Sequence, residues 1–143
     1  MKSIRVTRLW QRAGVYAVRT QAMVNGFGIP LHEEFDEHDT EDTKYILILD
    51  EEKPIATCRL YIETDGIAKI ERVCVLESER NKGVGRCLIQ EGEKWLKELG
   101  IKKVIITSRD EVVQFYEKLG YTIHWDKVED VGIFNIIYTD KDL

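Results

Sequence analysis

The chain has 143 residues, of which 43% are hydrophobic and 33% are charged, and its formal net charge is −5. This length suits one folded domain, 1–143, with one hydrophobic core, and the negative charge disfavours general nucleic-acid binding. No apolar run approaches the roughly 20 residues of a membrane span. No signal-peptide core follows Met1, so we expect a cytoplasmic protein with no membrane partner.

The N-terminal part predicts a strand, a helix and a loop. Residues 4–7 alternate between apolar and polar side chains, as in a strand. Residues 11–24 predict a helix, because their apolar members recur at helical spacing: Val15, Val18, Ala22 and Met23. Two glycines and a proline within 25–30 should end that helix.

The region 27–43 is dense in carboxylates, especially between His32 and Asp39. Two interpretations stay open for this acidic loop. It is either a solvated surface or a negative region that draws a cationic amine such as a polyamine, a lysine side chain or an aminoglycoside. His32 and His38 are six residues apart, which suits no regular helix face, so we expect no metal site.

The middle of the chain predicts a three-stranded meander and a long helix. The strands are expected at 45–49, 54–62 and 68–75, with turns between them. The helix is expected over 84–99, stopped by Gly100. Its apolar face comprises Leu88, Gly92, Trp95, Leu96 and Leu99, and its water-facing side comprises Arg86, Gln90, Glu93, Lys94 and Lys97.

The C-terminal part predicts a strand at 103–107, a short helix at 111–119 and two final strands. These last strands are expected at 122–126 and 133–138, joined by a turn at 129–132. The segment 133–138 is apolar enough to pair with a second copy if it forms an exposed sheet edge, so a homodimer is one expectation.

A glycine-rich turn, 80–85, joins the third strand of the meander to the long helix. The first N–H groups of a helix lack internal partners and lie at the positive end of the helix dipole, so they attract phosphate. Gly83 and Gly85 allow close approach of the backbone, and Arg80, Lys82 and Arg86 add positive charge. This stretch therefore predicts a phosphate site.

Three phosphate-binding patterns compete for this turn. A P-loop needs Lys-Ser or Lys-Thr after its glycines, and neither is present. A dinucleotide fingerprint needs a third glycine where Leu88 stands. The remaining pattern, Arg/Gln-x-x-Gly-x-Gly/Ala, is matched by Arg80, Gly83 and Gly85.

This turn resembles the acyl-CoA pyrophosphate loop of the GCN5-related N-acetyltransferase (GNAT) family, and 115–121 resembles that family's Phe-Tyr-x-x-x-Gly-Phe signature. The resemblance covers about 46–121. Residues 11–45 are loosely similar to a bacterial branch labelled ElaA- or YjcF-like, through Val18-Arg19, Gly28-Ile29-Pro30 and Asp36-x-x-Asp39.

The resemblance implies a fold, an activity and a cosubstrate. The expected fold is a mixed, mostly antiparallel α/β sheet with helices on both faces and a splayed parallel strand pair that forms the acyl-CoA cleft. The expected activity is direct transfer of an acetyl group from acetyl-CoA to a primary amine. The alternative is a non-catalytic acyl-CoA sensor or subunit, which the family departures at Arg109 and Asn135 keep open. A protein lysine or N-terminus as acceptor is a third possibility.

The resemblance also implies the residues that bind acetyl-CoA. They lie on the strand before the turn, in the turn and helix start, and after the next strand: Val73, Cys74, Val75, Arg80, Asn81, Lys82, Gly83, Val84, Gly85, Arg86, Ser108, Arg109, Phe115 and Tyr116. The N–H of Val73 is the expected donor to the thioester oxygen. Arg109 departs from the family pattern and is assigned either to pantetheine or to the phosphates.

Two catalytic residues are implied in the same way. Tyr116 matches the family tyrosine that protonates the leaving sulfur, and the other interpretation is a packing tyrosine. Glu71 is the expected base for the amine. It is placed by strand alternation on the face of Val73, with Arg72 on the opposite face. In the other interpretation Glu71 pairs with Arg59 or Lys69.

The three cysteines are odd in number and lack Cys-x-x-Cys spacing, so we expect Cys58, Cys74 and Cys87 to be reduced. Alternation points the Cys74 side chain away from the face of Val73 and Val75. With no base identified beside it, a nucleophilic role for Cys74 is disfavoured.

Overall fold

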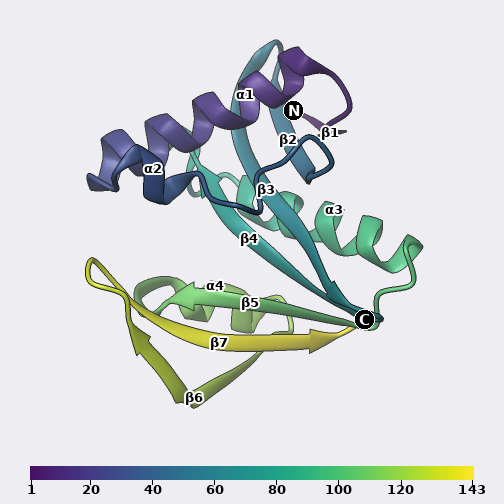
Figure 1. The fold of residues 1–143 in the computed structure, drawn as a ribbon, viewed down its shortest axis with the longest axis vertical. Helices are drawn as coiled ribbons and strands as arrows, with labels where there is room; N and C mark the ends of the chain where they lie inside the picture. Colours follow the sequence, from purple (N-terminus) through teal and green to yellow (C-terminus); the bar gives the residue numbers. More distant parts are fainter.

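The structure is a computed structural model that describes all residues, 1–143 (Figure 1). One seven-stranded sheet has the order β1-β2-β3-β4-β5-β7-β6. Its strands are β1 (Lys2–Arg5), β2 (Lys44–Asp50), β3 (Lys53–Thr64), β4 (Ile67–Val75), β5 (Lys103–Arg109), β6 (Thr122–Asp130) and β7 (Asn135–Asp142). All neighbours pair antiparallel except β4 and β5, which are parallel. The predicted mixed, mostly antiparallel sheet is confirmed.

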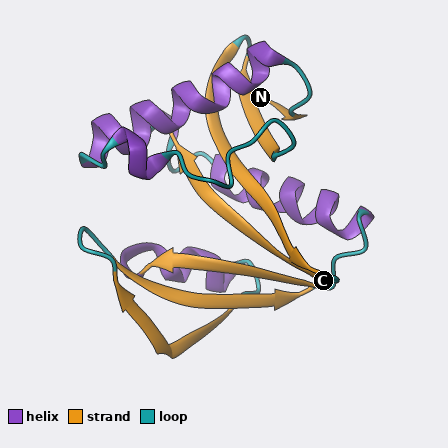
Figure 2. Cartoon of the chain, viewed as in Figure 1, coloured by secondary structure: helices purple, strands orange, loops and turns teal.

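Helices cover both faces of this sheet (Figure 2). They are α1 (Leu9–Arg19), which continues as the π-helical turn η1 (Thr20–Asn25), α2 (Leu31–Glu34), α3 (Val84–Glu98) and α4 (Val113–Lys118). Short 3-10 turns, η2 (Glu77–Glu79) and η3 (Asp110–Val112), precede α3 and α4. None of these helices has the length and apolar character needed to cross a lipid bilayer.

Strand β2 shows how the sequence divides the core between the two faces. Its buried residues alternate, so Ile46 and Ile48 join the larger cluster with α3 and α4, while Tyr45, Leu47 and Leu49 pack against Val15 of α1. The continuous apolar run at 45–49 therefore reflects a strand covered by helices on both sides.

The apolar face of α3 is confirmed at Leu88, Gly92 and Leu96, which are buried. Leu99 is 44% exposed, because α3 ends at Glu98 and Leu99 is the cap residue that leaves the helix. Glu93 does not face water as predicted. Its carboxylate accepts a hydrogen bond from the Tyr121 hydroxyl at 2.6 Å and others from the Lys141 ammonium at 3.1 Å.

Several boundaries differ from the sequence prediction, including the ends of β5 at Arg109 rather than 107 and of β7 at Asp142 rather than 138. The first strand is Lys2–Arg5 rather than 4–7, because these residues pair with 46–49 of β2. Strand β6 runs on to Asp130, and the last turn lies at 131–134 rather than at 129–132. Strand β7 is paired on both sides, by β5 and β6, so the prediction that 133–138 forms an exposed edge is wrong; the edge strand is β6.

The parallel strands β4 and β5 separate along their length. They pair only at their first residues, from Ile67 with Lys103 to Lys69 with Ile105. Beyond that point β4 continues beside β3 and β5 continues beside β7, and Figure 1 shows the two strands diverging. The predicted splayed pair is therefore confirmed, and it opens a gap in the middle of the sheet.

Candidate functional site

A β-bulge in β4 decides which side chains face the two sides of this gap. Thr57 of β3 pairs with Cys74, but Arg59, two residues on, pairs with Glu71, so β4 carries one extra residue there. Arg72 takes a left-handed conformation with φ 50°. Such an insertion interrupts the alternation of side chains along a strand.

The bulge overturns the predicted facing of Glu71 and Arg72. Both side chains point toward the α1 and α2 side, where Glu71 contacts His38 and Arg72 contacts Asp36. Val73 lies on the other side, packed against the core beneath α3 and α4. Glu71 and Val73 therefore belong to opposite faces of the sheet, and Glu71 and Arg72 belong to the same face.

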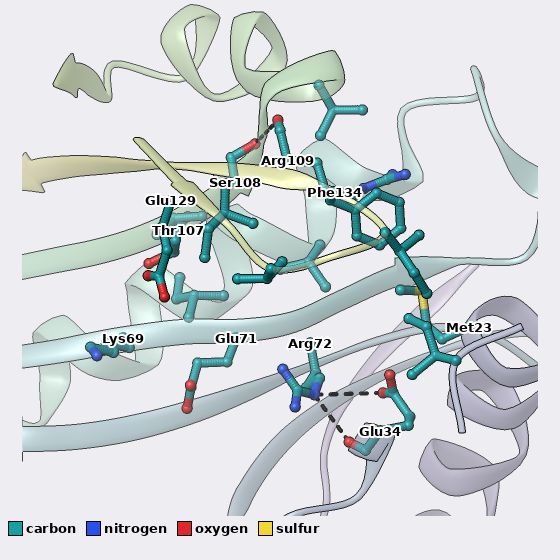
Figure 3. Close-up of a pocket in the computed structure, with 18 of the residues that line it drawn as sticks. Met23, Glu34, Lys69, Glu71, Arg72, Thr107, Ser108, Arg109, Glu129 and Phe134 are labelled. Carbon is teal, nitrogen blue, oxygen red and sulfur yellow. Dashed lines mark hydrogen bonds and ion pairs between the residues drawn. The ribbon is translucent and has the colours of Figure 1, made fainter. Parts of the chain in front are cut away.

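A first cavity of about 850 Å³ occupies the gap on the α1 and α2 side. Its walls come from β4, β5, the end of η1, α2 and the β6–β7 turn. Figure 3 shows Lys69, Glu71 and Arg72 along β4, with Thr107 and Ser108 of β5 across from them and Glu129 of β6 beside these. Apolar side chains complete the lining, including Met23, Ile29, Ile105, Ile133 and Ile136.

A second cavity of about 420 Å³ lies at the start of α3. It is lined by most of the residues predicted to bind acetyl-CoA: Val73, Cys74, Val75, Arg80, Asn81, Gly83, Val84, Gly85, Arg86, Arg109, Phe115 and Tyr116. The two cavities share Met23, Val73, Arg109, Val112 and Tyr116, so they meet in the gap between the splayed strands. A ligand can thus pass from the start of α3 into the first cavity.

The turn before α3 presents unpaired backbone donors to the second cavity. The N–H groups of Asn81, Lys82 and Gly83 donate to no acceptor in the chain. The N–H groups that open α3 also lack intrahelical partners. Left-handed conformations at Asn81 (φ 63°) and Gly83 (φ 80°) shape this turn. Together these donors form an anion-binding concavity at the positive end of a helix of 15 residues.

Two predicted cofactor residues lie outside the second cavity. The Lys82 ammonium is exposed and lies 3.7 Å from the Glu79 carboxylate. Ser108 is buried, lines the first cavity, and its hydroxyl donates to the Arg109 carbonyl at 2.8 Å. Arg80 lines the second cavity and its Nε donates to the Val75 carbonyl at 3.1 Å, which fixes the strand end beside the turn.

Tyr116 lies where the two cavities meet. Its ring packs in the core, edge-on to Phe115 and Tyr121, and only 6% of the residue is exposed. Burial raises the pKa of the phenol well above its ordinary value, although the nearby Arg109 charge acts in the opposite direction. The phenol therefore stays protonated at neutral pH and is available as a hydrogen-bond donor.

Arg109 is held between two aromatic rings. Its guanidinium lies 4.8 Å from the ring centre of Phe27 and 4.9 Å from that of Phe134, which are themselves edge-to-face. These rings come from the segment after η1 and from the β6–β7 turn, so the cluster bridges the two sides of the cleft. Sequence reasoning missed Phe27 and Phe134, because nothing in their spacing links them to Arg109.

Three carboxylates of the acidic loop are paired within the protein, whereas Glu33, Glu37, Glu41 and Asp42 are exposed. Arginines neutralise the three: Arg19 contacts Glu34 at 2.9 Å and Asp39 at 2.6 Å, and Arg59 contacts Asp36 at 2.8 Å and Asp39 at 2.9 Å. Arg19 and Arg59 are almost fully buried. Both interpretations of the loop are therefore wrong for these three carboxylates.

The same network holds the loop against the sheet. Burial of Asp39 opposes its ionisation, but hydrogen bonds from Arg19 and Tyr45 prevail and hold the pKa of this carboxyl well below its usual range. The motifs Val18-Arg19 and Asp36-x-x-Asp39 contain three members of this network. Their partner on β3, Arg59, lies 20 or more residues further along the chain, so no local pattern links it to them.

Cys74 lines the second cavity, and its side chain packs on the face opposite to Val73 and Val75. The thiol packs with Val18, Ala22 and Leu76, and burial raises its pKa to about 12. A thiol in this state is a poor nucleophile.

Comparison with known proteins identifies the family. The model of the Acetyltransferase (GNAT) family matches residues 8–121, so the chain belongs to this family. The chain is 34% identical over 134 residues to the uncharacterised N-acetyltransferase YjcF of Bacillus subtilis (strain 168), covering 93% of this chain and 94% of that one. The resemblance to the YjcF-like branch is thereby confirmed.

Solved structures have the same fold. A Lactobacillus plantarum protein crystallised as a candidate N-acetyltransferase has a TM-score of 0.92 at 30% identity, with 99% of this chain and 97% of that chain covered. An aminoglycoside 6'-N-acetyltransferase, crystallised with coenzyme A, has a TM-score of 0.80 at 15% identity, with 99% and 97% covered. At that identity the second likeness concerns the fold alone.

Proposed function

We propose that this protein is an acetyl-CoA-dependent N-acetyltransferase that transfers an acetyl group directly to a primary amine. The observation that carries the proposal is the gap between β4 and β5, which joins the concavity of unpaired N–H groups in the second cavity to the mixed polar and apolar first cavity. A long ligand with an anionic end fits this arrangement, with its reacting end in the gap.

The chain's own groups divide between the two ends of such a ligand. The N–H groups from Asn81 to Arg86 bind the pyrophosphate, and Arg80 and Arg86 contribute charge there. The edge of β4 that β5 leaves unpaired, at Val73 and Val75, hydrogen-bonds the pantetheine amides as an added strand would. The N–H of Val73 donates to the thioester oxygen and stabilises the charge that develops on it.

The acceptor enters from the first cavity as an ammonium ion, and Glu71 accepts one of its protons, directly or through water, which leaves a neutral amine. The amine nitrogen then bonds to the thioester carbon and the carbon–sulfur bond breaks. Tyr116 supplies a proton to the departing thiolate. The second proton that the nitrogen loses replaces the proton taken from Tyr116, so the products are an amide, a thiol and one proton released through Glu71.

Thermal melting in the presence of ligands tests the first half of this proposal. We expect acetyl-CoA and CoA to raise the melting temperature and ATP and NAD to leave it unchanged. At a ligand concentration 100 times the dissociation constant, the folded state gains about 2.7 kcal/mol. A rise with NAD or ATP alone would contradict the assignment of the second cavity.

Release of free thiol from acetyl-CoA in the presence of primary amines tests the second half. The panel should include a polyamine, a lysine-containing peptide and an aminoglycoside. Thiol release that depends on one of these amines supports the enzyme. Binding of CoA without thiol release for any amine would favour the sensor instead.

Two glycines at the ends of α3 provide a matched test of the turn. Gly83 has φ 80° and Gly100 has φ 86°, and an added Cβ would meet no atom within 4 Å at either position. Gly83→Ala and Gly100→Ala should therefore each cost about 1–2 kcal/mol of stability, from backbone strain alone. Only Gly83→Ala should weaken CoA binding, measured by titration calorimetry. Equal affinities in the two variants would remove the turn from the binding site.

A further inference from the structure

We propose that His38 is a positioning residue that orients Glu71 and makes its action as a base depend on pH. The inference rests on the proposed function, because it assigns a partner to the base of that reaction. His38 is in the acidic loop, 33 residues before Glu71, and its Nδ1 lies 3.1 Å from Glu71 Oε1. Neither cavity is lined by His38, so it acts on an acceptor only through Glu71.

Three contacts hold His38 beside Glu71, one through its ring and two through its backbone. The ring stacks on Tyr61 at a centroid distance of 3.8 Å and an interplanar angle of 18°. The backbone N–H donates to Asp36 Oδ1 at 2.9 Å, and the backbone carbonyl accepts from the Thr43 hydroxyl. The stacking orients the ring, the backbone contacts position the residue, and the loop that carries it is itself held by buried ion pairs.

The two carboxylate oxygens of Glu71 have different surroundings. Oε1 lies 3.1 Å from His38 Nδ1 and 3.5 Å from the Arg59 guanidinium, whereas Oε2 has no hydrogen bond or ion pair in the chain. Glu71 lines the first cavity, so Oε2 remains available to an amine. A neutral imidazole that donates from Nδ1 steadies this arrangement without adding charge.

Protonation of His38 changes the balance of charge around Glu71. The charged and titratable groups near the pair are Arg59, Tyr61 and Glu63 on β3, Lys69 and Arg72 on β4, Glu34, Asp36 and Asp39 in the acidic loop and the helix before it, and Glu129 across the cavity. Arg59 and Arg72 are themselves paired with carboxylates of the loop. An imidazolium would add a positive charge 3.1 Å from Oε1 and make the carboxylate a weaker acceptor for the ammonium proton of the substrate.

The test compares two histidine–carboxylate pairs. His38→Asn keeps an N–H donor at the position of Nδ1 but cannot be protonated. The control is His124→Gln, because His124 Nε2 lies 2.9 Å from Asp140 Oδ1 in a pair of similar exposure, and His124 lines neither cavity. The readout is kcat/KM for one amine between pH 5 and 9.

We expect His38→Asn to retain the rate at high pH and to shift the acid limb of the profile by about one pH unit toward lower pH. His124→Gln should reproduce the wild-type profile. An acid limb that is unchanged in His38→Asn overturns the inference. A wild-type protein that binds CoA but acetylates no amine overturns the proposed function instead, so the two failures are distinguishable.

Nuclear magnetic resonance of the histidine ring nitrogens gives a second measurement that needs no activity and no variant of His38. In the wild-type protein His38 should carry its proton on Nδ1 at pH 8. In Glu71→Gln the Nδ1 resonance should move, because the carboxylate that accepts its proton has been replaced by an amide. An Nε2 proton at pH 8, or an Nδ1 resonance unaffected by Glu71→Gln, contradicts the pairing even if His38→Asn fails to fold.

Discussion

Tyr116→Phe is expected to lower kcat about 100-fold and to leave the KM for acetyl-CoA nearly unchanged. The phenol lies at the junction of the two cavities and keeps its proton because it is buried. Phenylalanine keeps the ring and its edge-on contacts but removes the donor for the departing thiolate, and loss of one general acid typically costs 10²–10⁴-fold. Steady-state kinetics of thiol release with the best amine of the panel provides the measurement.

Tyr121→Phe is the matched control for this variant. Tyr121 is in the same core cluster, but it lines neither cavity and its hydroxyl donates to Glu93 at 2.6 Å. Removal of that hydroxyl should cost about 1–3 kcal/mol of stability, because a hydrogen bond to a charged carboxylate is lost, while kcat stays the same. Equal kcat values for Tyr116→Phe and the wild type would assign Tyr116 to packing.

Arg19→Met is expected to lower the free energy of unfolding by about 3–5 kcal/mol. The guanidinium donates to the Glu34 carboxylate and carbonyl and to both oxygens of Asp39, and it is fully buried. Methionine fills similar space but leaves two buried carboxylates without this partner, and removal of one member of a buried ion pair costs about this much. Urea denaturation at pH 7 measures the change.

The exposed pair of Arg5 and Glu98 supplies the control. Its two side chains are 38% and 50% exposed, although they approach to 2.6 Å. Because solvent screens exposed ion pairs, Arg5→Met should lower the free energy of unfolding far less than Arg19→Met does. A similar loss in both variants would show that burial of the acidic loop contributes little to stability.

Local sequence patterns predicted much of the fold, because helix and strand periods are set by neighbouring residues. The alternation in β2 and the helical spacing of Leu88, Gly92 and Leu96 follow directly from the chain. The Gly-rich turn was equally visible, because the conformation of Gly83 and the free N–H groups beside it are local properties. Local patterns of this kind are sufficient to indicate where the second cavity lies.

The acceptor side was not predictable in the same way. Which carboxylates of the acidic loop are neutralised depends on Arg59, which the fold brings from β3. The side chain directions of Glu71 and Arg72 depend on one extra residue in β4, and no local pattern indicates a bulge at an arginine. Alternation therefore gave a wrong answer at the residue assigned to catalysis.

That extra residue in β4 also has an evolutionary consequence. Positions along this strand contribute to different parts of the site: Lys69, Glu71 and Arg72 border the first cavity, Val73 borders both cavities, and Val75 borders only the second. Under the proposed function, substitutions at the first-cavity positions would change the acceptor that fits while the cosubstrate stays the same. Preferences for acceptor and for donor are expected to vary independently among relatives that keep the bulge.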